Sequence, residues 1–159
     1  MLLLWTHRNR QRSHMNIQPR LKIRSQIRTI EEANKMIPLL KSITEDVKNT
    51  WSKILKDRVA LESNRDDDSL KEVLNTSIDK INGYIREIEE LGCFMEEFKR
   101  GVVNFPSLYL GRKIFLCWNS EEDSIKYWHE LDESYNERTR IIDVNDFLFS
   151  RPGDVHEIL

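Results

Sequence analysis

Apolar residues recur along two stretches of the chain at the spacing of an α-helix. The first stretch starts after Thr29, and its apolar positions are Ala33, Ile37, Leu40, Val47, Trp51, Ile54 and Leu61, with Thr44 and Arg58 filling the missing turns. The second is made of Leu70, Leu74, Ile81, Tyr84, Ile88 and Leu91. Intervals of three and four residues place these side chains on one face of a helix. The pattern therefore predicts two long amphipathic helices.

The ends of both helices carry sequence signals. Thr29 with Glu32, and Ser69 with Glu72, each have the spacing of a capping box, in which a hydroxyl and a carboxylate bond the free N–H groups of a first turn. Gly92 follows the second stripe, where a left-handed residue ends a helix. Pro38 interrupts the first stripe, but the stripe continues in phase beyond it. We therefore expect a kink near Asn34 and not a stop.

The connection between the two stripes is short and polar. Residues 62–68 contain no apolar side chain. A short link between two long helices makes them antiparallel, so the sequence predicts a helical hairpin of the coiled-coil type. Two such helices cannot bury both stripes completely on each other. The remaining apolar surface calls for a β layer or for a second copy of the chain.

The periodicity changes after Gly92. Residues 93–98, 102–105 and 113–118 are short runs rich in β-branched and aromatic side chains, separated by turn-like segments at 99–101 and 106–111. They predict a small three-stranded antiparallel meander. The expected fold class is α+β, with the long antiparallel hairpin packed against this meander.

Charge divides the chain into three parts. The first 30 residues contain no acid and seven bases, which are Arg8, Arg10, Arg12, Arg20, Lys22, Arg24 and Arg28, whereas the rest of the chain holds 18 bases against 27 acids. We expect a basic, disordered arm at 1–28, a single α+β domain at 29–142, and a loosely attached tail at 143–159, where Pro152 and Gly153 oppose regular structure.

The basic arm leaves several hypotheses open. It could bind nucleic-acid phosphate, lie on an anionic membrane or be an organelle transit peptide, but it lacks the interleaved aromatic residues that stack on bases, which favours a disordered leader. No stretch approaches the roughly 20 apolar residues of a membrane span, and the Met1–Trp5 run is too short for the core of a signal peptide. We expect no membrane span and a cytoplasmic protein.

The two cysteines, Cys93 and Cys117, lie in apolar surroundings without metal-ligand spacing, so we expect buried thiols. Cys117 with His129 as its base could form a nucleophilic pair, but burial in an apolar strand would raise the pKa of the thiol and disfavour this hypothesis. Nucleotide-driven chemistry is also disfavoured, because the chain has neither a phosphate-binding glycine motif nor enough glycines to build one.

An ordered set of motifs carries a family resemblance. The segments are Ile30-Glu31-Glu32-Ala33-Asn34, Pro38-Leu39-Leu40, Glu90-Leu91-Gly92, Gly101-Val102-Val103-Asn104-Phe105-Pro106, Leu116-Cys117-Trp118 and Tyr127-Trp128-His129-Glu130-Leu131. Over residues 29–140 or so, the chain resembles the prokaryotic family known as domain of unknown function 2203. The resemblance implies acids at Glu90, Glu97 and Glu122 and a histidine at His129. The family usually has aspartate where this chain has Asn104, and glycine where it has Glu121.

These residues suggest the candidate chemistry. His129 with the carboxylates of Glu122, Glu90 and Glu97 is a possible ligand set for iron, manganese or zinc, with positions left open for water. The alternatives are a histidine held structurally at the edge of an aromatic cluster, and general acid or base work without a metal.

Two hypotheses on function follow. The first is a non-catalytic interaction module that self-associates or binds a protein partner through the hairpin. The second is a small metal-binding protein or metal-dependent enzyme centred on His129 and Glu122. Whether the chain is an enzyme stays open at this point, and nucleic-acid binding could involve only the basic arm.

Overall fold

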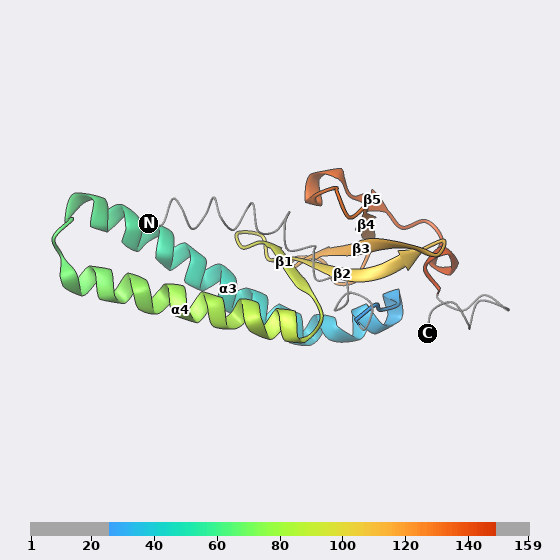
Figure 1. The fold of residues 1–159 in the computed structure, drawn as a ribbon, viewed down its shortest axis with the longest axis horizontal. Coiled ribbons are helices and arrows are strands. Elements are labelled where there is room, and N and C mark those ends of the chain that lie inside the picture. The colour runs from blue at the N-terminus through green and yellow to red at the C-terminus, as the bar shows by residue number, and fades with distance from the viewer. Residues whose placement is uncertain (1–25, 149–159) are drawn as a thin grey trace.

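The computed structural model describes residues 26–148 as an α+β fold, in which two long antiparallel helices lie beside a sheet (Figure 1). Helix α3 spans Ile30–Ser63 and helix α4 spans Asp68–Glu90. The hairpin extends well past the sheet at the end where the two helices are joined. The fold class predicted from the sequence is confirmed. The predictions for residues 1–25 and 149–159 lie outside the described residues.

The start of α3 is the capping box expected from the sequence. Glu32 N–H donates to Thr29 Oγ1 at 3.1 Å, and Thr29 N–H donates to Glu32 Oε2 at 3.2 Å. The helix continues through Pro38 without a stop. Trp51, which the stripe places between the helices, is half-buried and meets the ring of Phe98 edge to face at 5.2 Å.

The predicted capping box at the start of α4 is wrong. Asp67 caps this helix instead, because its carboxylate accepts the N–H of Leu70 at 2.9 Å, and the helix therefore begins before Ser69. An aspartate is as good an N-cap as serine, and because the cap lies two residues earlier, the donor that it satisfies is the N–H of Leu70 and not that of Glu72. The end of α4 agrees with the prediction, with Gly92 at a φ of +80° directly after the cap Leu91.

The sheet is a five-stranded antiparallel meander in the order β1-β2-β3-β4-β5. The strands are Phe94–Glu97, Val102–Tyr109, Arg112–Asn119, Tyr127–His129 and Thr139–Arg140. The sequence predicted three strands, and β4 and β5 were missed because three and two residues are too few for an alternating pattern.

Strand β2 also runs through Pro106 to Tyr109, where a turn was predicted. The carbonyl of Pro106 points away from β3 and accepts the N–H of Arg28 at 2.9 Å. Since the N and C=O of one residue point to the same side of a strand, the missing N–H of Pro106 costs no bond to β3.

Two apolar clusters hold the molecule together. The larger one packs α3 and the end of α4 against one sheet face, which supplies Val103, Phe105, Ile114, Leu116 and Trp118. The smaller one lies within the hairpin and consists of Val47, Ile54, Leu74 and Ile81. Phe147, in the short 3-10 helix η2 at Val144–Phe147, is buried in the larger cluster, so this part of the predicted tail is packed and not loose.

No helix among residues 26–148 combines the length and the apolar character that a membrane crossing requires.

Candidate functional site: a polar network on the outer face of the sheet

Polar side chains gather on the sheet face that points away from the helices. Asn104 on β2 is paired with Cys117 on β3, and His129 on β4 is paired with Phe115, two residues before Cys117. Because side chains alternate along a strand and paired residues share a face, these four side chains lie on one face. The opposite face carries the core residues Val103, Phe105 and Leu116. The alternation of the strands therefore places Asn104 and His129 together.

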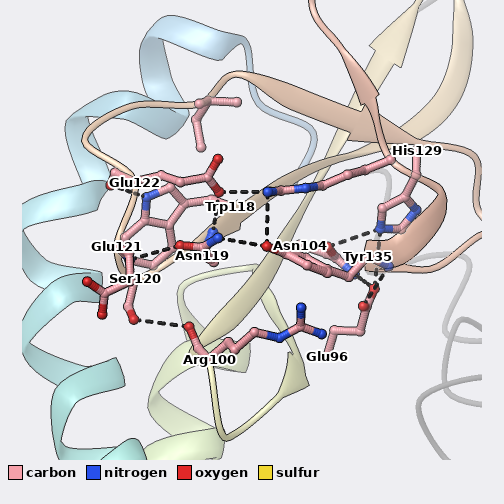
Figure 2. Close-up of polar contacts among 12 residues, drawn as sticks. Glu96, Arg100, Asn104, Trp118, Asn119, Ser120, Glu121, Glu122, His129 and Tyr135 are labelled. Atoms are coloured by element: carbon pink, nitrogen blue, oxygen red, sulfur yellow. Dashed lines mark hydrogen bonds and ion pairs between the residues drawn. The ribbon is translucent and has the colours of Figure 1, made fainter.

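His129 is buried, with 1% of its side chain exposed, and both ring nitrogens have partners (Figure 2). Nδ1 lies 2.7 Å from the carbonyl oxygen of Glu130. Nε2 lies 3.2 Å from Asn104 Oδ1 and 3.3 Å from Glu96 Oε1. Asn104 in turn donates from Nδ2 to Glu96 Oε1 at 2.9 Å. The three side chains form a closed triangle of polar contacts.

This geometry determines the protonation of His129. The Glu130 carbonyl can only accept, so Nδ1 carries a hydrogen. The bond from Asn104 Nδ2 to Glu96 leaves Asn104 Oδ1 facing the ring, so both neighbours of Nε2 are acceptors and Nε2 carries a hydrogen as well. The acceptors at both ring nitrogens therefore favour the imidazolium form of His129, paired with the Glu96 carboxylate.

The pKa values of the pair agree with this assignment. Burial acts to lower the pKa of His129, but the bonds to Glu96 and to the Glu130 carbonyl outweigh it and raise the pKa above its ordinary value. Burial likewise acts to raise the pKa of Glu96, but the hydrogen bonds from His129, Asn104 and the Tyr135 N–H outweigh it and lower the pKa. Each group favours the charged form of the other.

Glu96 comes to the network from strand β1, at a β-bulge. In the β1–β2 ladder, Met95 pairs with Val103 and Glu97 pairs with Val102, so the register shifts between the two pairs and Glu96 is the extra residue. Phe94 pairs with Asn104, so alternation places Glu96, two residues further on, on the same outer face, and the bulge leaves it without a paired residue on β2. Here Glu96 reaches Asn104 and His129, and it also accepts the Tyr135 N–H at 2.8 Å.

A second ion pair lies beside the first. Arg138 donates from Nη1 to Glu122 Oε1 at 2.7 Å, and both side chains are more than four-fifths buried. The Arg138 guanidinium lies between the rings of Tyr127 and Tyr135, at 3.9 and 4.0 Å from their centroids, where the negative faces of the rings favour a cation. Glu122 also accepts a hydrogen bond from the Asn119 N–H at 2.8 Å, so the backbone holds the carboxylate in place beside Arg138.

Tyr135 joins the two pairs. Its hydroxyl oxygen accepts hydrogen bonds from Asn119 Nδ2 at 2.9 Å and from Arg138 Nη2 at 3.0 Å, while its backbone N–H donates to Glu96 (Figure 2). Tyr135 starts the 3-10 helix η1 at Tyr135–Glu137, between β4 and β5. The network therefore anchors the β4–β5 connection onto the outer face of the sheet.

Cys117 lies within this network but is not a reactive thiol. The side chain is fully buried, and burial, with a smaller contribution from the Glu96 charge, raises the pKa of the thiol to about 12, despite the nearby Arg138 guanidinium. At neutral pH the group is the neutral thiol, which is a poor nucleophile. The structure thus agrees with the sequence argument against a cysteine nucleophile.

The four predicted metal ligands do not converge on one point. Glu122 is paired with Arg138, Glu97 is paired with Arg100, and Glu90 is exposed at the end of α4. Only His129 belongs to the triangle, and the carboxylate beside it is Glu96. Among residues 26–148, no three His, Cys, Asp or Glu side chains are grouped in a way that could hold a metal ion. The predicted ligand set is not assembled in this structure.

Sequence reasoning missed Glu96, Arg138 and Tyr135. Glu96 and Glu97 are adjacent acids, and only the pairing of β1 with β2, Phe94 opposite Asn104, decides which of them lies on the face of His129. Arg138 and Tyr135 lie in a connection with no periodic pattern. A usable signal was Asn104 itself, an amide in an otherwise apolar strand, because a buried amide needs polar partners.

The arrangement favours a structural role over catalysis. Both N–H groups of His129 are occupied, and the ring has no exposed surface for a substrate. A pocket of about 510 Å³ lies elsewhere, between the start of α3 and η2, and none of the network side chains lines it. Proton transfer by His129 would require the network to open first.

Comparison with known proteins gives a family and no activity. A family model described as "Uncharacterized conserved protein (DUF2203)" matches residues 26–141. Neither the curated proteins nor the solved structures contain a significant match.

Proposed function

The chain belongs to the DUF2203 family of uncharacterized conserved proteins. From this premise we propose that it is a non-catalytic interaction module. It binds another protein surface through the distal hairpin, by which we mean the part of α3 and α4 beyond Trp51, next to the connection between the two helices. A cytoplasmic location fits this proposal, because Cys93 and Cys117 are both free thiols.

The observation that carries the proposal is a helix face that the sheet covers only in part. On α3, Thr44 lies against Gly101, and Lys48 pairs with Glu121 at 3.3 Å, so this face meets the β2 and β3 ends of the sheet. The same face continues at helical spacing to Leu55 and Val59 near the end of α3, and the end of the hairpin where the two helices are joined extends past the sheet (Figure 1). The side chains of Leu55 and Val59 are 39% and 64% exposed.

The distal hairpin has few apolar contacts of its own. Its cluster contains four buried residues, compared with fourteen in the cluster beside the sheet. Two helices that pack only on each other leave apolar surface facing water, and this is a typical reason for such helices to associate further. Leu55 and Val59 are that surplus surface on α3.

The polar network supports a non-catalytic role. Its charged groups satisfy one another, and its bonds hold the β4–β5 connection in place. The metal-dependent alternative centred on His129 and Glu122 has less support, since each of these side chains is bonded to a different charged partner.

Site-specific photo-crosslinking tests the proposal. A photoreactive phenylalanine derivative is placed at Leu55 in the full chain, expressed in cells of the source organism, and irradiated. We expect a covalent protein adduct. The matched control carries the same group at Ile142, which is 95% exposed and lies just before η2, the short helix beside the start of α3. Equal labelling at both positions, or no adduct at Leu55, would contradict an interface on the hairpin.

A further inference from the structure

We propose that residues 130–138, the connection between β4 and β5, form a pH-sensitive latch, which stays closed on the outer face of the sheet while His129 is protonated and opens when His129 loses its proton. His129 is the last residue of β4, so the titrating group lies at the base of the latch. The latch does not involve the hairpin, because it packs on the sheet face that points away from the helices.

Two of the contacts that hold the latch lead to the imidazole of His129 (Figure 2). The first is direct, from Nδ1 to the Glu130 carbonyl oxygen at 2.7 Å. The second runs through Glu96, whose Oε1 lies 3.3 Å from Nε2 and whose Oε2 accepts the Tyr135 N–H at 2.8 Å. One ring therefore holds both the first residue of the latch and its central part.

A neutral imidazole cannot keep both of these contacts. It carries one hydrogen, whereas Nδ1 faces the Glu130 carbonyl and Nε2 faces Glu96 Oε1 and Asn104 Oδ1. With the hydrogen on Nδ1, the lone pair of Nε2 points at the carboxylate, and with the hydrogen on Nε2, the lone pair of Nδ1 points at the carbonyl. Turning the Asn104 amide over would give Nε2 a donor but would set Oδ1 against Glu96. Every neutral arrangement leaves two acceptors in contact.

The other groups around the ring do not replace the lost charge. On β3, Phe115 meets the ring edge to face at 5.7 Å and offers no polar atom. In the latch, Glu133 is a second acid whose charge acts on the ring at longer range. The guanidinium of Arg138 is paired with Glu122 at 2.7 Å. Once the ring is neutral, the charges of Glu133 and Glu96 repel each other, which acts to separate the latch from β1.

Cys117 is a natural reporter of the latch. It is fully buried within the network, where the charges of Glu96 and Arg138 act on its thiol. Cys93 is also fully buried, but it follows the end of α4 and belongs to the apolar cluster beside the sheet. Burial raises the pKa of both thiols to about 12. Opening of the latch should therefore expose Cys117 alone, whereas global unfolding exposes both thiols.

Thiol labelling of the full chain tests the latch. The chain is treated with iodoacetamide at a series of pH values, and the rate at each cysteine is measured by mass spectrometry of its peptide. The ratio of the Cys117 rate to the Cys93 rate removes the pH dependence of thiol ionisation. This ratio should rise severalfold as the pH is raised from about 6.5 through the folded pKa of His129. A ratio that stays constant would overturn the latch.

Three variants assign the rise to the pair of His129 and Glu96. Glu96→Gln removes the charge that holds the proton on Nε2, so the rise should begin at a lower pH. His129→Gln has no titrating ring, so the ratio should be the same at every pH. The matched control is Glu97→Gln, because this adjacent acid pairs with Arg100 and should leave the rise unchanged.

Circular dichroism checks that each variant stays folded. A rise at the original pH in Glu96→Gln, or a rise that persists in His129→Gln, would overturn the latch. A shift of equal size in Glu96→Gln and Glu97→Gln would do the same, because it would reflect the loss of any nearby negative charge and not the contact with Nε2.

Discussion

At the scale of single residues, His129 is the side chain on which the outer face of the sheet depends most. It bonds the Glu96 carboxylate from β1, the Asn104 amide from β2 and the Glu130 carbonyl that follows β4. Glu96 is also held by the Tyr135 N–H. A change at His129 therefore loosens three strands and the β4–β5 connection together.

We expect His129→Ala to lower the free energy of unfolding by about 2 to 4 kcal/mol, because it leaves the Glu96 carboxylate, 19% exposed, without its opposite charge. His129→Gln keeps a donor toward Glu96 and should cost less. Urea denaturation followed by circular dichroism measures both values. A loss below about 0.5 kcal/mol for the alanine variant would show that the network contributes little.

The same pair predicts how stability depends on pH. The folded pKa of His129 is raised above its unfolded value of about 6.5, so its contribution is fully present below that value and is lost as the pH rises through the folded pKa. The folded pKa of Glu96 is lowered, so its contribution is present above the unfolded value and is lost as the pH falls through the folded pKa.

The free energy of unfolding should therefore fall as the pH is raised from about 6.5 through the folded pKa of His129. Urea titrations across this range measure the fall. The groups that face the imidazolium are Glu96, Asn104, the Glu130 carbonyl and, at longer range, Glu133. His129→Gln removes the imidazole and should therefore remove the decline. A decline that persists in this variant would assign it to another group.

At the scale of elements, the turns of the sheet differ in how closely they are packed. Gly101, before β2, has a φ of +61°, and a Cβ there would lie 2.9 Å from Ser120 Oγ and 3.2 Å from Thr44 Cβ. Gly111, between β2 and β3, has a φ of +85°, but a Cβ there would meet nothing within 4 Å. The first glycine is needed for its conformation and for space, and the second for its conformation alone.

Gly101→Ala should lower the free energy of unfolding by about 2 to 4 kcal/mol. The left-handed backbone is strained for alanine, and the added Cβ would push against Thr44 on α3 and against Ser120 at the end of β3. Gly111→Ala is the matched control and should cost only about 1 to 2 kcal/mol, from the strain. Thermal and urea unfolding compare the two. Equal losses would mean that the contact between Thr44 and Gly101 is easily relaxed.

At the scale of the whole molecule, the two apolar clusters should differ in local stability. The cluster beside the sheet contains fourteen buried residues, and the one inside the hairpin contains four. Native-state hydrogen exchange should therefore show the hairpin beyond Trp51 opening at a lower free energy than strands β2 and β3. Uniform protection along both helices would contradict this order.

The sequence by itself determined the elements whose signals are local. The stripes of α3 and α4 depend on helical spacing, the start at Thr29 depends on two capping residues three positions apart, and the end at Gly92 depends on one left-handed residue. The first three strands and the α+β class followed in the same way, from alternation and turn residues. Each of these features is set by neighbours within a few positions.

Only the tertiary structure decided the polar network. Glu96 rather than Glu97 meets His129 because the pairing of Phe94 with Asn104 places Glu96, two residues further on, on the face of His129, and neither acid differs in its local sequence signal. Glu122 pairs with Arg138, and Pro106 stays inside a strand, because of partners contributed by distant segments. A carboxylate finds its cation through packing across the sheet, and sequence spacing carries no record of that contact.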